Sequence, residues 1–260
     1  VINENGDCPL YINNIFGGGN IAPIIGDVVT TVECGEGSYD NFYGGSNFAD
    51  IYGNVTVNIF GGTYNRLFGG SRGASDDGAD IRSFPSYAEL LADYNLPVEE
   101  RQYSQSLRDY MHFDPTDNTG FATELVGEGG NVTTNLFGGA INVAAFGGSH
   151  IKGVIDGKIQ VNVFDASNCG LDLEDLYGAG CDTPYEPIYA LEQGEEIRLS
   201  PEVNIMHGTV KGNVFGGGQG LTANTVGTNP VVNMGYYDAM GTTSIEGSLI
   251  DRLVDTVGAH

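Results

Sequence analysis

The chain has 260 residues, of which 41 are glycine, and its 34 acidic residues against 10 basic ones give a formal net charge of −24. Nucleic acid is excluded as an expected partner because its phosphates would repel so acidic a surface, and no run reaches the roughly 18 apolar residues of a membrane span. The glycines follow no three-residue period, which excludes collagen, and an apolar fraction of 40% allows a buried core.

A short phrase recurs along the chain: an apolar residue, then Phe or Tyr, then Gly-Gly. Many copies follow a β-branched run and an asparagine, as in residues 55–59. Equivalent positions at Cys8, Cys34 and Phe60 are spaced by 26 residues, and later intervals are 27 and 28 residues. Two longer intervals, of 77 and 42 residues, indicate insertions. Runs of this kind that end in Gly-Gly are typical of strands closed by tight turns.

A period of about 27 residues with three short strands predicts a parallel β-solenoid, whose equivalent residues stack ~4.8 Å apart. We therefore predict an all-β fold: a single-stranded right-handed parallel β-helix of about seven coils, one domain over residues 1–260. The handedness follows the general preference for right-handed crossovers. A propeller or a leucine-rich repeat fits less well, because the first needs ~40 residues per unit and the second a fixed Leu-Asn spacing.

Alternation along residues 55–59 places Val55, Val57 and Ile59 in the core and the residues between them outside. Amides and hydroxyls at the outward positions of equivalent strands form a candidate binding face: Thr56, Asn58, Thr133, Asn135, Gln160, Asn162 and Asn204. Asparagines that face the core are the alternative, because a bulge before Gly-Gly would reverse the parity. We interpret the aromatic residues of the phrase as stacked packing residues.

Residues 74–130 lack the phrase and predict a helical insertion, with one helix over residues 87–94 and a second that Pro97 opens over residues 98–111. We expect the insertion to lie against one face of the solenoid, either as a lid or recognition arm or as a cover for apolar surface. Residues 182–201 predict an acidic loop insertion. Helical spacing and cap signals over residues 248–258 predict a C-terminal helix that covers the open end of the solenoid.

The four cysteines form two pairs by position. Cys8 and Cys34 are one period apart, so stacking would bring them within disulfide distance. Cys169 and Cys181 flank the widest loop between copies of the phrase and predict a second disulfide. Two disulfides favour an oxidising compartment, either secreted or at the cell surface. Zinc is the alternative, although no C-x₂-C spacing occurs and the histidines are scattered, at His112, His150, His207 and His260.

No common catalytic motif, such as G-x-S-x-G, H-E-x-x-H or a P-loop, occurs in the sequence. Amides and hydroxyls on the outward face bind sugars but do not donate protons, so this face by itself predicts binding without catalysis. A polysaccharide lyase or hydrolase, whose catalytic acids the insertions would supply, is an alternative function. No cofactor other than calcium is expected, and its candidate ligands are acidic residues: Asp76, Asp77, Asp80, Asp172, Glu174, Asp175 and Asp182. Their spacing matches no calcium-loop pattern, and a solvated acidic surface is the alternative.

The segments Asn54-Val-Thr-Val-Asn-Ile-Phe-Gly-Gly-Thr and Asn65-Arg-Leu-Phe-Gly-Gly-Ser, and a similar one from Val203, resemble repeats of large surface-exposed proteins of anaerobic gut bacteria. Those repeats look like right-handed parallel β-helix modules of the adhesin kind. The resemblance covers the repeats, misses both insertions and carries no catalytic residue. It implies a secreted or wall-attached segment of a larger protein with flanking domains.

We therefore expect a non-catalytic surface module, which is an adhesin or scaffold segment and binds carbohydrate. Its partner would be a glycan or a host or bacterial surface protein. Besides the polysaccharide-active enzyme, a self-assembling fibre subunit is a further alternative, because the ends of a solenoid can stack on one another.

Overall fold

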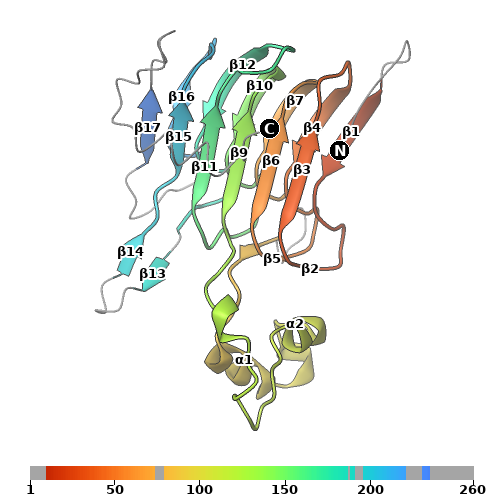
Figure 1. Ribbon diagram of the computed structural model, residues 1–260, viewed down its shortest axis with the longest axis vertical. Helices are drawn as coiled ribbons and strands as arrows, with labels where there is room; N and C mark the ends of the chain where they lie inside the picture. Colours follow the sequence, from red (N-terminus) through yellow and green to blue (C-terminus); the bar gives the residue numbers. More distant parts are fainter. Residues whose placement is uncertain (1–9, 74–78, 187, 191–195, 221–229, 235–260) are drawn as a thin grey trace.

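The computed structural model describes residues 10–73, 79–186, 188–190, 196–220 and 230–234. Three parallel sheets dominate it (Figure 1). The first contains, in order, β1 (Tyr11–Phe16), β4 (Ser38–Tyr43), β7 (Thr63–Phe68), β10 (Gly139–Phe146), β12 (Leu171–Tyr177) and β16 (Val214–Phe215). The second contains β3 (Val28–Val32), β6 (Val55–Ile59), β9 (Val132–Leu136), β11 (Ile159–Val163), β15 (Glu202–Ile205) and β17 (Val231–Met234). The third contains β2 (Ile24–Ile25), β5 (Ile51–Tyr52) and β8 (Ile81–Arg82).

Equivalent residues of successive repeats pair in parallel, as the period predicts. Val28 pairs with Val55, and Val55 pairs with Val132 across the 77-residue interval. Within the repeats, consecutive strands enter different sheets. Each six-stranded sheet gains one strand from each successive repeat, whereas the third sheet has three strands among the described residues. The prediction of a β-rich chain with parallel sheets is confirmed. An antiparallel pair, β13 (Ile188–Ala190) with β14 (Glu196–Arg198), lies in the second insertion.

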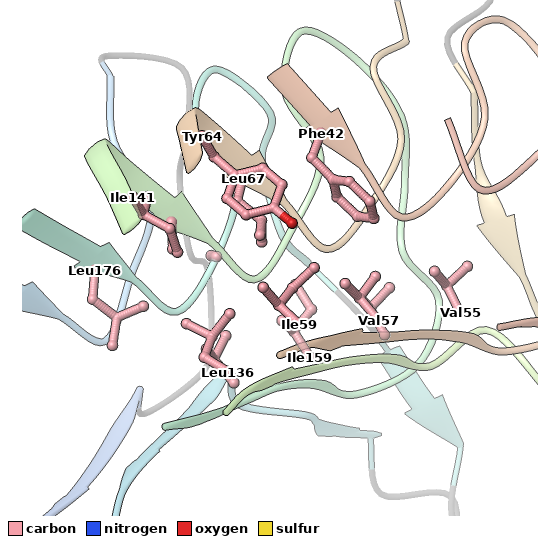
Figure 2. Close-up of a cluster of buried hydrophobic side chains, with 14 of the residues drawn as sticks. Phe42, Val55, Val57, Ile59, Tyr64, Leu67, Leu136, Ile141, Ile159 and Leu176 are labelled. Carbon is pink, nitrogen blue, oxygen red and sulfur yellow. The ribbon is translucent and has the colours of Figure 1, made fainter. Parts of the chain in front are cut away.

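The core lies between the two six-stranded sheets (Figure 2). Val57 and Ile59 project into it from the second sheet, and Phe42 and Leu67 project from the first; all four are fully buried. Because successive residues of a strand point to opposite faces, Asn58 lies on the outer face of the second sheet. The alternation along residues 55–59 therefore predicted the parity correctly.

Aromatic residues of the phrase form two stacks along the repeat direction. Neighbouring rings of the first stack are 4.7 to 5.0 Å apart between centroids, in the order Phe16, Tyr43, Phe68, Phe146, Tyr177 and Phe215. The second stack contains Phe60, Phe137 and Phe164, with centroids 4.5 and 4.8 Å apart. These spacings equal the distance between neighbouring strands. The interpretation of the aromatic residues as packing residues is confirmed.

The Gly-Gly turns are required by the close approach of neighbouring repeats. A Cβ atom at Gly44 would overlap both the carbonyl oxygen of Gly69 and the side chain of Val57. Gly44 has no positive φ angle, so space rather than backbone conformation selects glycine there.

The first insertion contains α1 (Tyr87–Tyr94), a 3₁₀ turn η1 (Val98–Glu100), α2 (Gln105–Tyr110) and a second turn η2 (Thr123–Leu125). The helix predicted over residues 87–94 is confirmed, and Ser86 and Glu89 form a capping box that starts it. The single helix predicted over residues 98–111 is wrong, because the Ser104 hydroxyl caps the amide of Leu107 and starts a separate helix there.

The insertion extends beyond the ends of the long strands instead of covering a face of either six-stranded sheet (Figure 1). It packs on the third sheet, where Ile25 and Tyr52 join a cluster with Leu90, Leu107 and Met111. No helix among the described residues is both long and apolar enough to cross a membrane. The helix predicted over residues 248–258 lies outside the described residues.

Candidate functional site

The asparagines of the predicted binding face form a hydrogen-bonded ladder. The Nδ2 atoms of Asn135, Asn162 and Asn204 each donate to the Oδ1 atom of the preceding asparagine at 2.8, 2.8 and 2.9 Å, beginning at Asn58. Asn233 continues the ladder at 2.8 Å. Asn204 is 0% exposed and both Asn135 and Asn162 are 1% exposed. A ligand cannot reach these three side chains in this conformation, and their amides stabilise the stack.

A second row on the same face is more accessible. Thr56, Thr133 and Gln160 pair in register across β6, β9 and β11, and all three are half-buried. Glu202 pairs with Gln160 as the next residue of this row and forms an ion pair with Lys158. Ligand binding on this row stays a prediction.

The acidic candidates for calcium that the structure describes do not form a group of three carboxylates able to hold one ion. Asp76 and Asp77 lie outside the described residues. Asp80 forms an ion pair with Arg82 in the third sheet. The others lie along β12 or beyond it, where the Asp172 carboxylate contacts Lys211 Nζ at 2.6 Å, Glu174 is exposed, and Asp175 Oδ1 accepts the Asn213 amide at 2.7 Å. Only Asp182 belongs to a group of three ligand residues that could hold one ion, which among the described residues is the sole such group.

The disulfide in the structure joins Cys34 to Cys169, whose Cα atoms are 5.9 Å apart. The predicted Cys8–Cys34 and Cys169–Cys181 pairings are therefore wrong; Cys181 is a free thiol, and Cys8 lies outside the described residues. The cause is the loop after β11, which folds back over the glycine turns that follow β6 and β9. The Ser167 hydroxyl donates to the Phe60 carbonyl at 2.7 Å. This contact holds the loop so that Cys169 lies beside Cys34, which follows β3.

A pocket of about 580 Å³ lies between the third sheet and the insertion. Residues from both parts line it: Ile21, Pro23, Phe48, Ala49, Asp50, Tyr52, Asp80, Arg82 and the segment 99–104 except Tyr103. The pocket thus lies beneath the insertion that the sequence suggests as a lid or recognition arm, and that role stays a prediction. Phe48 is 37% exposed and Ile21 73% exposed, so the pocket offers an apolar wall beside its charged groups.

Ion pairs and backbone contacts hold the sheet side of this pocket. Arg82 pairs with Asp80, and Arg82 Nε lies 3.7 Å from Asp50 Oδ2. Asp80 Oδ1 accepts the amide of Val154 at 2.7 Å, while Asp50 Oδ1 accepts the amide of Asp80 at 2.9 Å. Both carboxylates thus bridge successive repeats. Burial, followed by the charge of Asp50, raises the pKa of the Tyr52 hydroxyl, so it stays protonated.

A buried ion pair holds the insertion side. Arg108 and Asp93, which are 4% and 6% exposed, contact each other inside the helical segment. Asp93 Oδ1 also accepts the amide of Gln102 at 2.7 Å, which fixes the pocket-lining segment 99–104. The Arg101 guanidinium lies 4.6 Å from the centre of the Tyr94 ring. The pocket wall therefore depends on a charge pair that lies outside the pocket.

A ladder of polar residues follows the Gly-Gly turns of the first sheet. Each member comes two residues after the second glycine, or its substitute, in successive repeats: Asn20, Asn47, Arg72, His150, Cys181 and Gln219. Backbone bonds set its register, since the Cys181 amide donates to Ser149 O at 2.9 Å and the Asp182 amide to His150 O at 2.8 Å. An imidazole and a thiol thereby occupy neighbouring steps.

The aromatic stack of the first sheet supports this histidine. The His150 ring lies 4.4 Å from the Phe68 ring, and its Nδ1 atom is 2.9 Å from the Tyr43 hydroxyl. Burial, followed by the charge of Arg66, lowers the pKa of His150. Burial and the Asp182 carboxylate raise the pKa of the Cys181 thiol to about 11. The neutral pair is therefore not an activated thiolate with an imidazolium.

The sequence contained a signal for this cluster that the spacing argument missed. His150 follows Phe-Gly-Gly-Ser and Cys181 follows Tyr-Gly-Ala-Gly, so alignment of the two copies of the phrase places them at one ladder position. The pairing of Cys181 with Cys169 concealed this. No sequence signal marked Phe48, Arg82 or Gln102 as neighbours, because their proximity depends on how the insertion docks.

No protein-family model, no curated protein and no solved structure matches the chain. The function is therefore inferred from the geometry of the chain's own residues.

Proposed function

We propose that the chain is a right-handed parallel β-helix of about seven coils that acts as a non-catalytic, extracellular binding module, and that it binds carbohydrate in the pocket beneath its insertion. The regular pairing of equivalent residues and the return of the chain to each sheet support the β-helix. The Cys34–Cys169 disulfide supports an oxidising compartment, because such bonds rarely persist in the cytosol. The adhesin-like resemblance of the repeats agrees with both points.

The observation that carries the binding proposal is the pocket between the third sheet and the insertion. A sugar ring presents an apolar C–H face and a rim of hydroxyl groups. Phe48 and Ile21 offer an exposed apolar wall, while Arg101, Gln102 and Ser104 offer donors and acceptors on the opposite side. A concave site with an apolar wall and a few convergent polar groups is the usual form of a small-ligand site.

Four carboxylates line the pocket: Glu99 and Glu100 on the insertion side are exposed, and Asp50 and Asp80 on the sheet side make contacts that favour binding over acid–base catalysis. Asp80 is held by Arg82 and the Val154 amide, and Asp50 accepts the Asp80 amide. A glycosidase needs one carboxyl group that can donate a proton and a second that can act as a base or nucleophile. The backbone amides and Arg82 already engage Asp50 and Asp80, which favours a structural role for these two carboxylates over proton transfer.

The test is a glycan-array screen of the folded chain, run with calcium and with a chelator and followed by a reducing-end assay on each hit. We expect binding without cleavage, and we expect Phe48→Ala and Gln102→Ala to weaken binding at least about tenfold, the loss of a buried contact or hydrogen bond. The matched control is Phe215→Ala, because Phe215 is 43% exposed and lies at the far end of the aromatic stack. Cleavage would favour the polysaccharide-active enzyme, and equal losses in all three variants would refute the pocket assignment.

A further inference from the structure

The cluster of His150, Cys181 and Asp182 brings three different ligand atoms together. An imidazole nitrogen, a thiol sulfur and a carboxylate oxygen lie within 4.8 Å of one another. Zinc accepts this mixture of nitrogen, sulfur and oxygen ligands, whereas calcium and magnesium prefer oxygen alone. We propose that these three side chains bind one zinc-class divalent ion.

The spacing requires only small side-chain movements. A tetrahedral zinc ion with bonds of about 2.0 Å to nitrogen and 2.3 Å to sulfur holds those two atoms about 3.5 Å apart. The backbone already has the required register, because Cys181 and Asp182 donate their amides to the carbonyls of Ser149 and His150. Rotation about side-chain bonds closes the remaining gap without moving a strand.

Tyr43 supplies the outer contact that a metal-bound histidine requires. Such a histidine almost always donates its second ring nitrogen to a nearby acceptor, which orients the ring. The Tyr43 hydroxyl lies 2.9 Å from His150 Nδ1; with Nε2 bound to the ion, Nδ1 carries the proton and donates it to this hydroxyl. Stacking on Phe68, with ring centroids 4.4 Å apart, fixes the plane of the imidazole.

Gln219 places a further oxygen beside the cluster. It occupies the next step of the ladder, and its Nε2 atom donates to the Tyr177 hydroxyl at 3.2 Å. This contact turns its Oε1 atom toward Cys181, where it lies 3.6 Å from Sγ. Three protein ligands leave a fourth tetrahedral position, which Gln219 or water fills. His150 and Cys181 are half-buried and Asp182 is exposed, so an ion can enter from solvent.

The test uses the full chain, freed of metal by a chelator and kept with Cys181 reduced. Zn²⁺ is titrated against a chromophoric chelator, and Co²⁺ serves as a probe because its thiolate complexes absorb in the near-ultraviolet. We expect one ion per chain. Cys181→Ser and His150→Gln should each weaken Zn²⁺ binding more than about tenfold, and Cys181→Ser should also abolish the thiolate absorption.

Two matched controls separate this site from general metal binding. His207→Gln removes a histidine that also lies beside a carboxylate, with Nδ1 3.8 Å from Asp165 Oδ2, but that belongs to no group of three ligand residues in the described part of the chain. Cys8→Ser removes the other cysteine that is not part of the Cys34–Cys169 disulfide. Both variants should bind Zn²⁺ like the original chain. Equal weakening by a control and by Cys181→Ser would overturn the proposal.

Tyr43→Phe keeps the aromatic stack and removes only the partner of Nδ1, so it tests the geometry even if His150→Gln does not fold. We expect affinity for Zn²⁺ to fall by about tenfold. Unchanged affinity would refute the role of Tyr43 and the assignment of Nε2. Absence of Zn²⁺ binding by the original chain, or peptide mapping that finds Cys181 in a disulfide, would overturn the site.

Discussion

Cys34 and Cys169 form a disulfide although 135 residues separate them in the chain. The two cysteines lie in the segments that follow β3 and β11, and these strands are separated in the second sheet by β6 and β9. The bond therefore ties four neighbouring strands together and also encloses the whole helical insertion.

Loss of this disulfide should lower stability. Cys34→Ser removes the constraint on the unfolded chain, and we expect the free energy of unfolding to fall by about 2–4 kcal/mol. Urea unfolding with and without reductant measures the loss, and reductant should have little further effect on the variant. Cys181→Ser is the control and should unfold like the original chain. Peptide mapping that recovers Cys8–Cys34 instead would contradict the pairing.

Gly44 should not tolerate a side chain. Gly44→Ala places a methyl group against the Gly69 carbonyl and the Val57 side chain, so neighbouring repeats must separate. Overpacking of this kind costs about 1–3 kcal/mol, and thermal unfolding measures it. Gly120→Ala is the control, because nothing lies within 4 Å of the added atom. A variant at Gly44 as stable as the control would show that the turns are less tightly stacked.

The asparagine ladder should contribute to stability through its interior members. Asn162→Ala leaves Asn204 Nδ2 without its acceptor and Asn135 Oδ1 without its donor, and all three positions are buried. An unpaired buried polar group costs about 1–3 kcal/mol. Denaturant unfolding should show a larger loss than for Gln160→Ala, a half-buried residue on the same strand. Equal losses would argue against the ladder.

Arg108 should stabilise the insertion and, through it, the pocket. Arg108→Met leaves the Asp93 carboxylate buried and unpaired, which costs about 3–5 kcal/mol. Hydrogen exchange should show faster opening of residues 87–111 while the strands stay protected. Lys211→Met, which breaks the exposed pair with Asp172, should have little effect because solvent screens that pair. Unchanged exchange in Arg108→Met would mean that the pair does not hold the segment.

Asp156 should make stability depend on pH. Its Oδ2 atom accepts the Ser83 amide at 3.1 Å, but burial raises its pKa above the ordinary value, and the repulsion of Asp80 adds to this while Arg82 opposes it. A raised pKa in the folded state means that its stabilising contribution is present below the ordinary carboxyl pKa and is lost as pH rises through the raised value. Asp156→Asn keeps an acceptor for Ser83 and should therefore gain stability over the original chain as pH rises from about 3.5 to about 7.

Asp114 is the control of opposite sign. Hydrogen bonds from the Thr116 amide and hydroxyl lower its pKa, so its contribution is present above the ordinary pKa and is lost as pH falls. Asp114→Asn should show no gain toward neutral pH. Parallel pH profiles for the Asp156 and Asp114 variants, measured by urea unfolding, would contradict the assignment of burial as the cause at Asp156.

The repeat pattern predicted the parts of the fold that depend on one repeat meeting its equivalent neighbour. The pairing of Val28 with Val55, the inward direction of Val57 and the stacking of Phe68 on Phe146 all follow from the register. Side chains at the same position of adjacent parallel strands must lie one strand spacing apart. A one-dimensional pattern is therefore sufficient to predict these contacts.

Tertiary structure alone decided the contacts made by segments that depart from the repeat. Cys169 reaches Cys34 because its loop folds back over two turns of glycine, and Gln102 and Phe48 line one pocket because the insertion docks on Tyr52. No register relates these residues, and their distances depend on loop conformations and side-chain packing. His150 and Cys181 lie between the two cases: their ladder position can be read from the sequence, but the approach of their ligand atoms depends on the Tyr43 contact and on the side-chain rotamers that packing selects.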